Sequence, residues 1–141
     1  MANILVSACL LGIPCRYKGD GKRCEAVVAL AKEHTLIPVC PEQMGGLPTP
    51  RDPAEQQGDR VISKAGADVT EQYAFGAQAA LAVAKINKVD MAILKSRSPS
   101  CGSGQIYDGS FGGKLIPGDG ICAALLKANG IRVLSEEDLA Q

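Results

Sequence analysis

Three cysteines that lie far apart in the sequence are the residues most able to do chemistry. Cys9 stands in SACLLG, Cys40 in PVCPE and Cys101 in SRSPSCGSG. Each is followed by or embedded in residues typical of turns, where a side chain contributes least to a core. Thiolates hold soft metals and iron–sulfur clusters or act as nucleophiles. These positions are therefore the candidates for an inorganic centre or a reactive thiol.

The chain has six cysteines among 141 residues, and the other three call for separate interpretations. Cys24 shares a helical face with Val27, and Cys122 lies in the first turn of a predicted helix. Both are expected to be buried as small hydrophobic residues. Cys15 follows Cys9 by six residues and is a candidate fourth ligand. With Cys15 the site would be a closed cluster or zinc site, whereas without it a cubane cluster would keep one iron open as a Lewis acid.

The elements that must position these cysteines follow from the apolar pattern. Four short apolar runs predict buried strands, and helical spacing between them predicts helices that cross over in the right-handed sense. The alternation predicts a single α/β domain over residues 1–141, with a mostly parallel, Rossmann-like central sheet of about four strands and helices on both faces. The predicted strands are 4–7, 36–39, 91–94 and 131–134, and the predicted helices are 24–31, 70–87, 119–130 and the short tail 135–141.

Cap residues and unassigned stretches complete this prediction. Thr70 and Asp119 are expected to cap their helices, and Gly130 to end the second of them. The stretches 41–69 and 96–118 show no clear element. Both follow a predicted strand, so they lie at the carboxyl edge of the sheet, where open α/β sheets bind ligands.

The strand assignment brings the three cysteines together. Cys9, Cys40 and Cys101 each come just after a predicted strand. Neighbouring parallel strands lie about 4.8 Å apart, so thiolates from their ends can meet at one centre. The pattern therefore predicts one inorganic site at the carboxyl edge, built without a local CxxC motif.

Composition limits the partners. Fifteen basic residues balance fifteen acidic ones, so no bulk field draws the chain to nucleic acid or membrane. No apolar segment approaches the roughly 20 residues of a membrane helix, and the first apolar run has no positive region before it. We expect a cytoplasmic protein, because clustered cysteines in a reducing compartment more often bind metal than form disulfides.

Four strings in the sequence resemble the bacterial thiouracil desulfurase family. They are VSACLLGIPCRYKGDGK, CPEQMGGLPTPR, SRSPSCGSG and PGDGICAALLKANGI, and the likeness runs over residues 4–134. The resemblance implies a 4Fe-4S cluster that removes sulfur from a thiolated nucleobase without net redox chemistry. It also implies Cys9, Cys40 and Cys101 as cluster ligands.

The same resemblance implies two catalytic side chains. Glu42 of CPE would be the general base that activates water, and Ser98 of SPSC the assisting hydroxyl. Arg51, Lys95 and Arg97 could line the pocket, although solvated surface charge is the expected role of each. The expected partner is a small thiolated nucleobase such as 2-thiouracil, with hydrosulfide released by a monomer or homodimer.

Two alternatives stay open at this point. One is a non-catalytic module with zinc or a closed cluster on the three cysteines and Cys15. The other is a thiol enzyme that transfers sulfur as a cysteine persulfide. Action on a thiolated nucleoside in RNA is disfavoured by the balanced charge.

Overall fold

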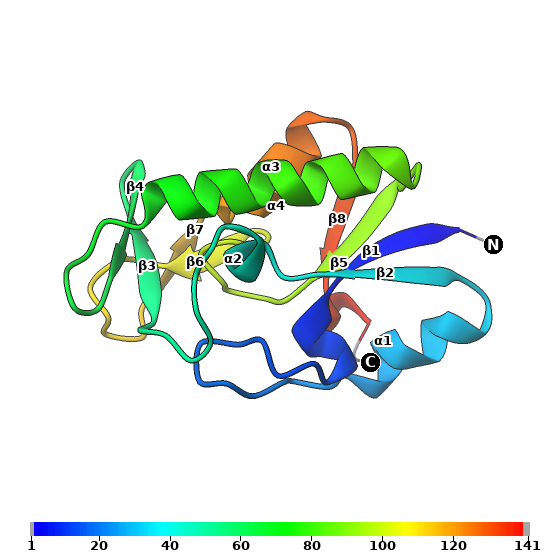
Figure 1. The fold of residues 1–141 in the computed structure, drawn as a ribbon, viewed down its shortest axis with the longest axis horizontal. Helices are drawn as coiled ribbons and strands as arrows, with labels where there is room; N and C mark the ends of the chain where they lie inside the picture. The colour runs from blue at the N-terminus through cyan, green and yellow to red at the C-terminus, as the bar shows by residue number, and fades with distance from the viewer. Residues whose placement is uncertain (1, 140–141) are drawn as a thin grey trace.

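A computed structural model describes residues 2–139 of the chain and places a fully parallel sheet of four strands at its centre (Figure 1). The strand order is β2-β1-β5-β8, so the chain starts in the middle of the sheet and reverses direction beside β1. The fold class predicted from the sequence is confirmed, and each strand lies within one residue of its predicted position. The strands are β1 (Asn3–Ser7), β2 (Thr35–Val39), β5 (Met91–Leu94) and β8 (Arg132–Ser135).

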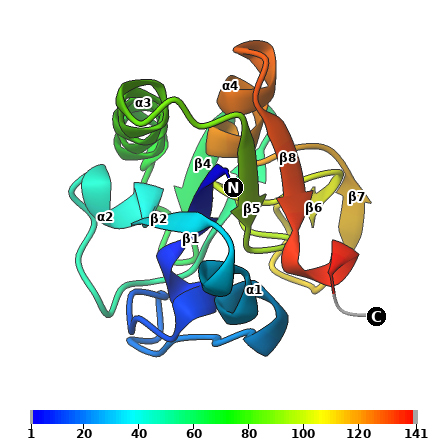
Figure 2. The same ribbon diagram turned by 90° about the vertical axis from the view of Figure 1, so that its right-hand side faces the viewer.

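Both faces of this sheet are covered, which explains the continuous apolar runs. Leu5 points into the core shared with helices α3 and α4, while Ile4 and Val6 point to the opposite core. The second core contains Val27 of α1, and Figure 2 shows α1 on the face opposite α3 and α4. The helices are α1 (Glu25–Ala29), α2 (Pro41–Met44), α3 (Thr70–Ile86) and α4 (Ile121–Ala128).

Short 3-10 turns extend the helical segments. The first helix is shorter than predicted, because α1 ends at Ala29 and continues as the turn η2 (Leu30–Lys32). Cys24 precedes α1 as its N-cap and so is not on the helix face. The predicted tail helix is the turn η3 (Glu136–Asp138), capped by the Ser135 hydroxyl. Its last two expected residues, 140 and 141, lie outside the described residues.

Two expected caps are wrong. The N-cap of α3 is Val69, and the Thr70 hydroxyl instead accepts a hydrogen bond from Val61 N at 2.8 Å. The N-cap of α4 is Gly120, and the Asp119 carboxylate instead receives Gly104 N and Lys127 Nζ. In both cases a group outside the first turn of the helix, Val61 N of β4 or Gly104 N of a loop, is the partner of the side chain in place of the helix end. The stop at Gly130 is confirmed by its left-handed φ of 80°.

The stretches without a predicted element contain two hairpins. β3 (Ala54–Gln57) pairs antiparallel with β4 (Arg60–Ser63), and β6 (Gln105–Tyr107) pairs antiparallel with β7 (Leu115–Pro117). Both lie beyond the carboxyl ends of β1 and β2, at the left of Figure 1. The sequence did not reveal them because strands of only three or four residues are too short to show a periodic pattern.

The short helix α2 packs against α3 through two glycines. A Cβ on Gly76 of α3 would lie 1.8 Å from the Pro41 carbonyl oxygen, and a Cβ on Gly45 would lie 2.0 Å from the Gln72 carbonyl oxygen. The backbones can approach this closely only because neither position has a side chain. This contact fixes α2, and with it Glu42, against the longest helix of the chain.

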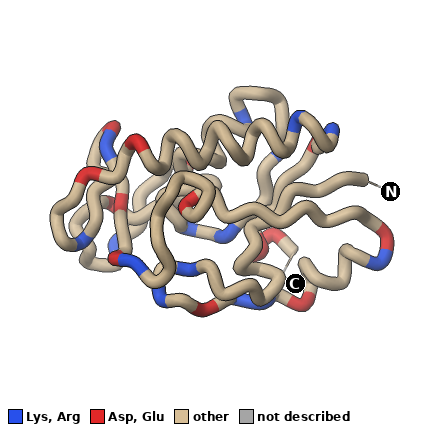
Figure 3. The backbone as a smooth tube through the Cα atoms, viewed as in Figure 1, with Lys and Arg blue, Asp and Glu red and all other residues tan. Residues whose placement is uncertain are grey.

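Charges of both signs are interspersed along the chain (Figure 3). Among the described residues, no helix combines the length and the apolar character that crossing a membrane requires.

Candidate active site

The three cysteines singled out from the sequence line one cavity of about 410 Å³. Cys9 lies in the turn η1 (Ala8–Leu11) directly after β1, Cys40 is the N-cap of α2 directly after β2, and Cys101 follows β5. β2, β1 and β5 are neighbours in the sheet, so their carboxyl ends deliver all three residues to one place. We call Cys9, Cys40 and Cys101 the cysteine floor of the cavity.

Cys15 also lines the cavity and lies against two residues of the floor. Its thiol is in hydrogen-bond contact with the thiols of Cys40 and Cys9. Cys101 is in contact with the hydroxyl of Ser7. Among residues 2–139, no three His, Cys, Asp or Glu side chains are placed to hold one metal ion. The thiols thus surround a cavity and do not converge on a single point.

The environment raises the pKa of Cys15, Cys40 and Cys101 and keeps these three thiols protonated. The hydrogen bond with Cys15 and then burial raise the pKa of Cys40. Burial is also the main cause that raises the pKa of Cys101. For Cys15, the hydrogen bond with Cys40 lowers the pKa, but the bond with Cys9 and burial together raise it to about 11. Metal binding at this site must therefore release protons.

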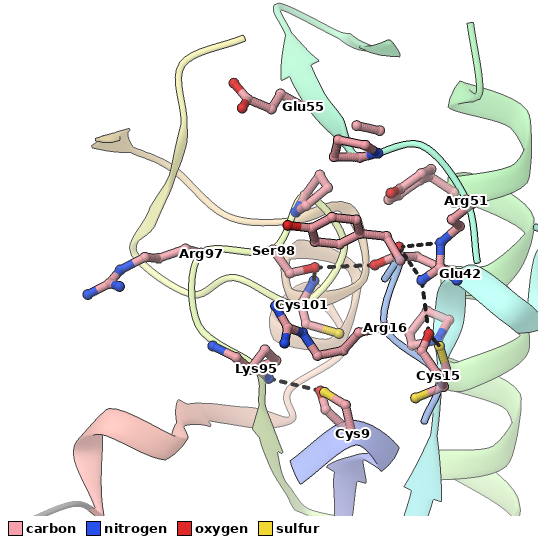
Figure 4. Close-up of a pocket in the computed structure, with 18 of the residues that line it drawn as sticks. Cys9, Cys15, Arg16, Glu42, Arg51, Glu55, Lys95, Arg97, Ser98 and Cys101 are labelled. Carbon is pink, nitrogen blue, oxygen red and sulfur yellow. Dashed lines mark hydrogen bonds and ion pairs between the residues drawn. The ribbon is translucent and has the colours of Figure 1, made fainter. Parts of the chain in front are cut away.

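Glu42 stands beside the floor on the first turn of α2. One carboxylate oxygen, Oε2, accepts hydrogen bonds from Arg51 Nη2 at 2.8 Å and Nε at 3.1 Å. The other oxygen, Oε1, lies 3.5 Å from Ser98 Oγ (Figure 4). Arg51 therefore fixes one side of the carboxylate and leaves the other side toward Ser98.

Ser98 has a defined direction for its proton. Its hydroxyl oxygen accepts hydrogen bonds from Ser100 N at 3.1 Å and Cys101 N at 3.0 Å. A hydroxyl has two acceptor lone pairs, so both are used. The O–H is left to donate to Glu42 Oε1 or to a molecule in the cavity.

Arg51 lines the cavity beside Glu42, whereas the sequence interpretation favoured a place on the surface. Its side chain is only 7% exposed and is ion-paired with Glu42. The same guanidinium donates from Nη2 to the Cys15 carbonyl at 3.1 Å, so it joins the Cys15 loop to Glu42. The sequence offers no signal for this, because Arg51 lies in a Pro-rich segment without periodicity.

Tyr73 is a second residue that the sequence analysis missed. It is 2% exposed on α3, lines the cavity and is in hydrogen-bond contact with Glu42. Burial and the negative charge of Glu42 raise its pKa, so its phenol stays protonated and donates to the carboxylate. In the sequence it is hidden within the apolar stripe of a helix.

Lys95 and Arg97 line the cavity, but their charges are paired with the C-terminal turn. Lys95 Nζ lies 2.9 Å from Glu136 Oε2, and Arg97 Nη2 lies 2.9 Å from Glu137 Oε2. The Arg97 side chain is 42% exposed, as expected for surface charge, whereas that of Lys95 is 24% exposed. In Figure 4 Arg97 points away from the cysteines.

The outer part of the cavity is lined by residues of the two hairpins and the loop between β6 and β7. Glu55 of β3 is buried and accepts Gly109 N at 2.9 Å and Phe111 N at 3.2 Å. Phe111 has a left-handed φ of 59°, which is uncommon for a residue with a bulky side chain. Both Glu55 and Phe111 line the cavity. We call the pair β3–β4 and β6–β7, with the connecting loop, the hairpin wall.

These features define the class of protein: a doubly wound α/β protein whose site, at the carboxyl edge where the strand order reverses, combines several thiols with an anchored carboxylate. The family model for 2-thiouracil desulfurase matches residues 4–138. The chain belongs to this family.

Two further comparisons agree with this assignment. The chain is 47% identical to the uncharacterized protein YbbK of Bacillus subtilis (strain 168), over 96% of this chain and 97% of that protein. Among solved structures, it is similar to the [4Fe-4S]-dependent thiouracil desulfidase TudS, with 47% identity and a TM-score of 0.93. That match covers 99% of this chain and 93% of the other.

Proposed function

We propose that this chain is an iron–sulfur-dependent desulfurase that converts a thiolated nucleobase such as 2-thiouracil into the oxygen analogue and hydrosulfide. Family membership and the 47% identity to a [4Fe-4S]-dependent thiouracil desulfidase support this function. The observation that carries it is the shared cavity of the cysteine floor, Glu42 and Ser98. Water supplies the oxygen, so the reaction needs no external oxidant or reductant.

The residues of the floor fit a 4Fe-4S cluster. Cys9, Cys40 and Cys101 would hold it, because thiolates are the usual ligands of iron–sulfur clusters. Thiols that are spread around a cavity can each bind a different iron of a cubane cluster, whereas a zinc ion needs ligands that converge on one point. When bound through three thiolates, such a cluster supplies one open iron, a Lewis acid that prefers soft sulfur donors.

Glu42 is the general base in this proposal. Arg51 holds Oε2 at 2.8 Å and so keeps the carboxylate oriented, while Oε1 can take a proton from a water molecule. That water is placed to add to the carbon of the thiocarbonyl. The Tyr73 phenol would hold the carboxylate from a second side, so that Glu42 meets the water in one fixed orientation.

Ser98 assists through its free O–H. Since two backbone N–H groups occupy its lone pairs, it acts as a donor toward the substrate or passes a proton to and from Glu42. The hydroxyl lies between Glu42 and the backbone of Cys101. It can therefore orient a thiocarbonyl compound between the base and the floor.

We further propose a small-molecule substrate and a cytoplasmic setting, with residues 1–141 as one iron–sulfur-binding domain. Net charge is zero and the two signs are interspersed, which supports a free nucleobase over RNA (Figure 3). The cavity of about 410 Å³ is of the size typical of small-molecule sites. A monomer or a homodimer would serve equally, because every proposed site residue comes from one chain.

The two alternatives predict different properties. A zinc module would contain zinc without acid-labile sulfide. A persulfide enzyme would be colourless and active without iron, and it would need a thiol of lowered pKa. In the cavity the pKa values of Cys15, Cys40 and Cys101 are raised, which argues against such a thiol at these positions.

The test is anaerobic purification followed by iron and sulfide analysis and an assay for hydrosulfide release from 2-thiouracil. We expect a coloured protein with iron and acid-labile sulfide. Glu42→Gln should keep the colour but lower kcat by about 10²- to 10⁴-fold, the usual contribution of a general base. Glu25→Gln is the matched control, because Glu25 is fully exposed and paired only with Arg23. Full activity in Glu42→Gln would remove the base from this proposal.

A further inference from the structure

The loop between β6 and β7 contains an aromatic residue in an unfavourable backbone conformation. Phe111 has a left-handed φ of 59°. Residues with a bulky side chain seldom adopt this conformation, because their Cβ comes too close to the following carbonyl oxygen. Such a residue persists only where its surroundings fix it, and binding sites are where such residues gather. Phe111 lines the cavity, so the unfavourable backbone belongs to a residue that faces the site.

The contacts that fix this loop from another segment come from β3. Glu55 Oε1 accepts Gly109 N at 2.9 Å and Phe111 N at 3.2 Å. Two residues along the same strand, Gln57 Nε2 donates to Gly109 O at 2.9 Å. One carboxylate oxygen thus binds the backbone N–H of Phe111 itself. Glu55 therefore controls the direction in which the Phe111 side chain leaves the backbone.

Glu55 has surroundings unlike those of the other carboxylate in the cavity. The Glu42 carboxylate is bound by the Arg51 guanidinium. Glu55 is 9% exposed, and among residues 2–139 no lysine or arginine is ion-paired with it. A buried carboxylate without a cation depends on hydrogen bonds for its stability, and those of Glu55 go to the loop. In Figure 4 Glu55 lies at the top of the view and Cys9 at the bottom, so Glu55 is not a second base beside the floor.

We propose that Glu55 is a positioning residue for substrate binding, which holds the Phe111 ring as a platform for a planar thiolated base. An aromatic side chain stacks on the flat face of a base and tolerates different substituents on its edge. A saturated ring with the same polar groups is not flat and stacks less well. The platform would therefore select aromatic thiocarbonyl rings over saturated or open-chain ones. This inference rests on the proposed function, since the platform is needed only if a thiolated base binds here.

The first experiment compares Glu55→Ala, Glu55→Gln and the wild-type protein with 2-thiouracil and 5,6-dihydro-2-thiouracil as substrates. In Glu55→Ala we expect KM for 2-thiouracil to rise about fivefold with kcat and iron content unchanged, because the ring loses its fixed direction. The preference for 2-thiouracil over the dihydro compound should fall by about the same factor. Glu55→Gln keeps an oxygen that can accept both N–H groups, so it should restore most of the affinity.

Calorimetry of uracil binding gives a readout that does not depend on turnover. The dissociation constant for uracil should rise in Glu55→Ala in parallel with KM. The matched control is Glu33→Ala, because Glu33 is exposed and lies outside the cavity. This substitution should change neither KM nor uracil binding.

The second experiment tests whether Glu55 acts through Phe111. A double-mutant cycle combines Glu55→Ala with Phe111→Leu, since residues that act through one another show non-additive effects. Glu55→Ala should raise KM in the wild-type background and cause no further rise once Phe111 is replaced. A further rise of the same size in the Phe111→Leu background would overturn the positioning role.

The remaining outcomes separate this inference from the proposed function. An active wild-type enzyme whose KM and uracil affinity are unchanged in Glu55→Ala overturns the role of Glu55 alone. A wild-type protein with iron and acid-labile sulfide that releases no hydrosulfide overturns the proposed function, and the inference with it. If Glu55→Ala does not fold, Glu55→Asp takes its place. Its carboxylate is one methylene shorter and cannot reach both N–H groups, so the same rise in KM is expected.

Discussion

The cysteine floor and the hairpin wall face the same cavity but are built on different principles. The floor follows the ends of three neighbouring parallel strands, of which β1 and β5 are almost wholly buried. The wall consists of short antiparallel pairs held by polar groups, among them the buried Glu55 carboxylate that binds two backbone N–H groups of the 108–113 loop. The proposed cluster ligands thus inherit the rigidity of the sheet, whereas the proposed substrate-facing surface lies on segments that can change without disturbing the sheet.

Loss of one floor cysteine should have the largest effect. Cys101→Ser removes a proposed ligand, so we expect iron and acid-labile sulfide to disappear and hydrosulfide release to stop. Iron analysis and visible absorbance of anaerobic protein measure this. Cys24→Ser, outside the cavity, should keep both the cluster and the activity. A fully loaded, active Cys101→Ser protein would falsify the ligand set.

Arg51 joins the Cys15 loop to Glu42 beside the floor, and its loss should have an intermediate effect. Arg51→Gln leaves the mostly buried Glu42 carboxylate without its cation, which costs about 3–5 kcal/mol of stability for a buried pair. Activity should fall by about 10- to 100-fold, as for other residues that orient a reacting group. Denaturant unfolding and steady-state kinetics check both expectations.

Arg60→Gln is the matched control for Arg51→Gln. Arg60 pairs with Asp68, but both side chains are about half exposed to solvent, so the loss of Arg60 should change stability little. If Arg51→Gln and Arg60→Gln lowered the stability equally, the ion pair of Arg51 with Glu42 would contribute no more than a surface pair.

A substitution in the hairpin wall should have the smallest effect, and it should change substrate binding alone. The Phe111 ring lines the cavity, and stacking of an aromatic side chain on a base contributes about 1–3 kcal/mol. Phe111→Leu keeps an apolar side chain, so we expect KM for 2-thiouracil to rise about fivefold with kcat and cluster content unchanged. Phe75→Leu, 65% exposed on α3, should change nothing. A large loss of cluster in Phe111→Leu would show that wall and floor are not separable.

The difference between the cysteine floor and the hairpin wall also explains which parts of the structure the sequence could predict. The strands under the floor are continuous apolar runs, so β1, β2, β5 and β8 were predicted within one residue, and with them the meeting of three distant cysteines. The proposed ligand and catalytic roles of these residues remain predictions that the experiments above test.

The rest of the site depends on tertiary partners that leave no periodic signal. β3, β4, β6 and β7 are only three or four residues long, too short for a periodic pattern to mark them. Arg51 resembles a surface charge until the fold brings it to Glu42. Asp119 and Thr70 were assigned as caps because local sequence cannot show a partner from another segment of the chain.

The origin of the floor from three separate strand ends also dictates the order of events when the protein is made. In a zinc finger the ligands are close in sequence, and the metal drives folding. Here Cys9 and Cys101 become neighbours only once β1 and β5 have paired, so no partial chain can present the complete set. With these proposed ligands, synthesis must yield a folded, cofactor-free form first, and insertion of iron and sulfide follows as a separate maturation step.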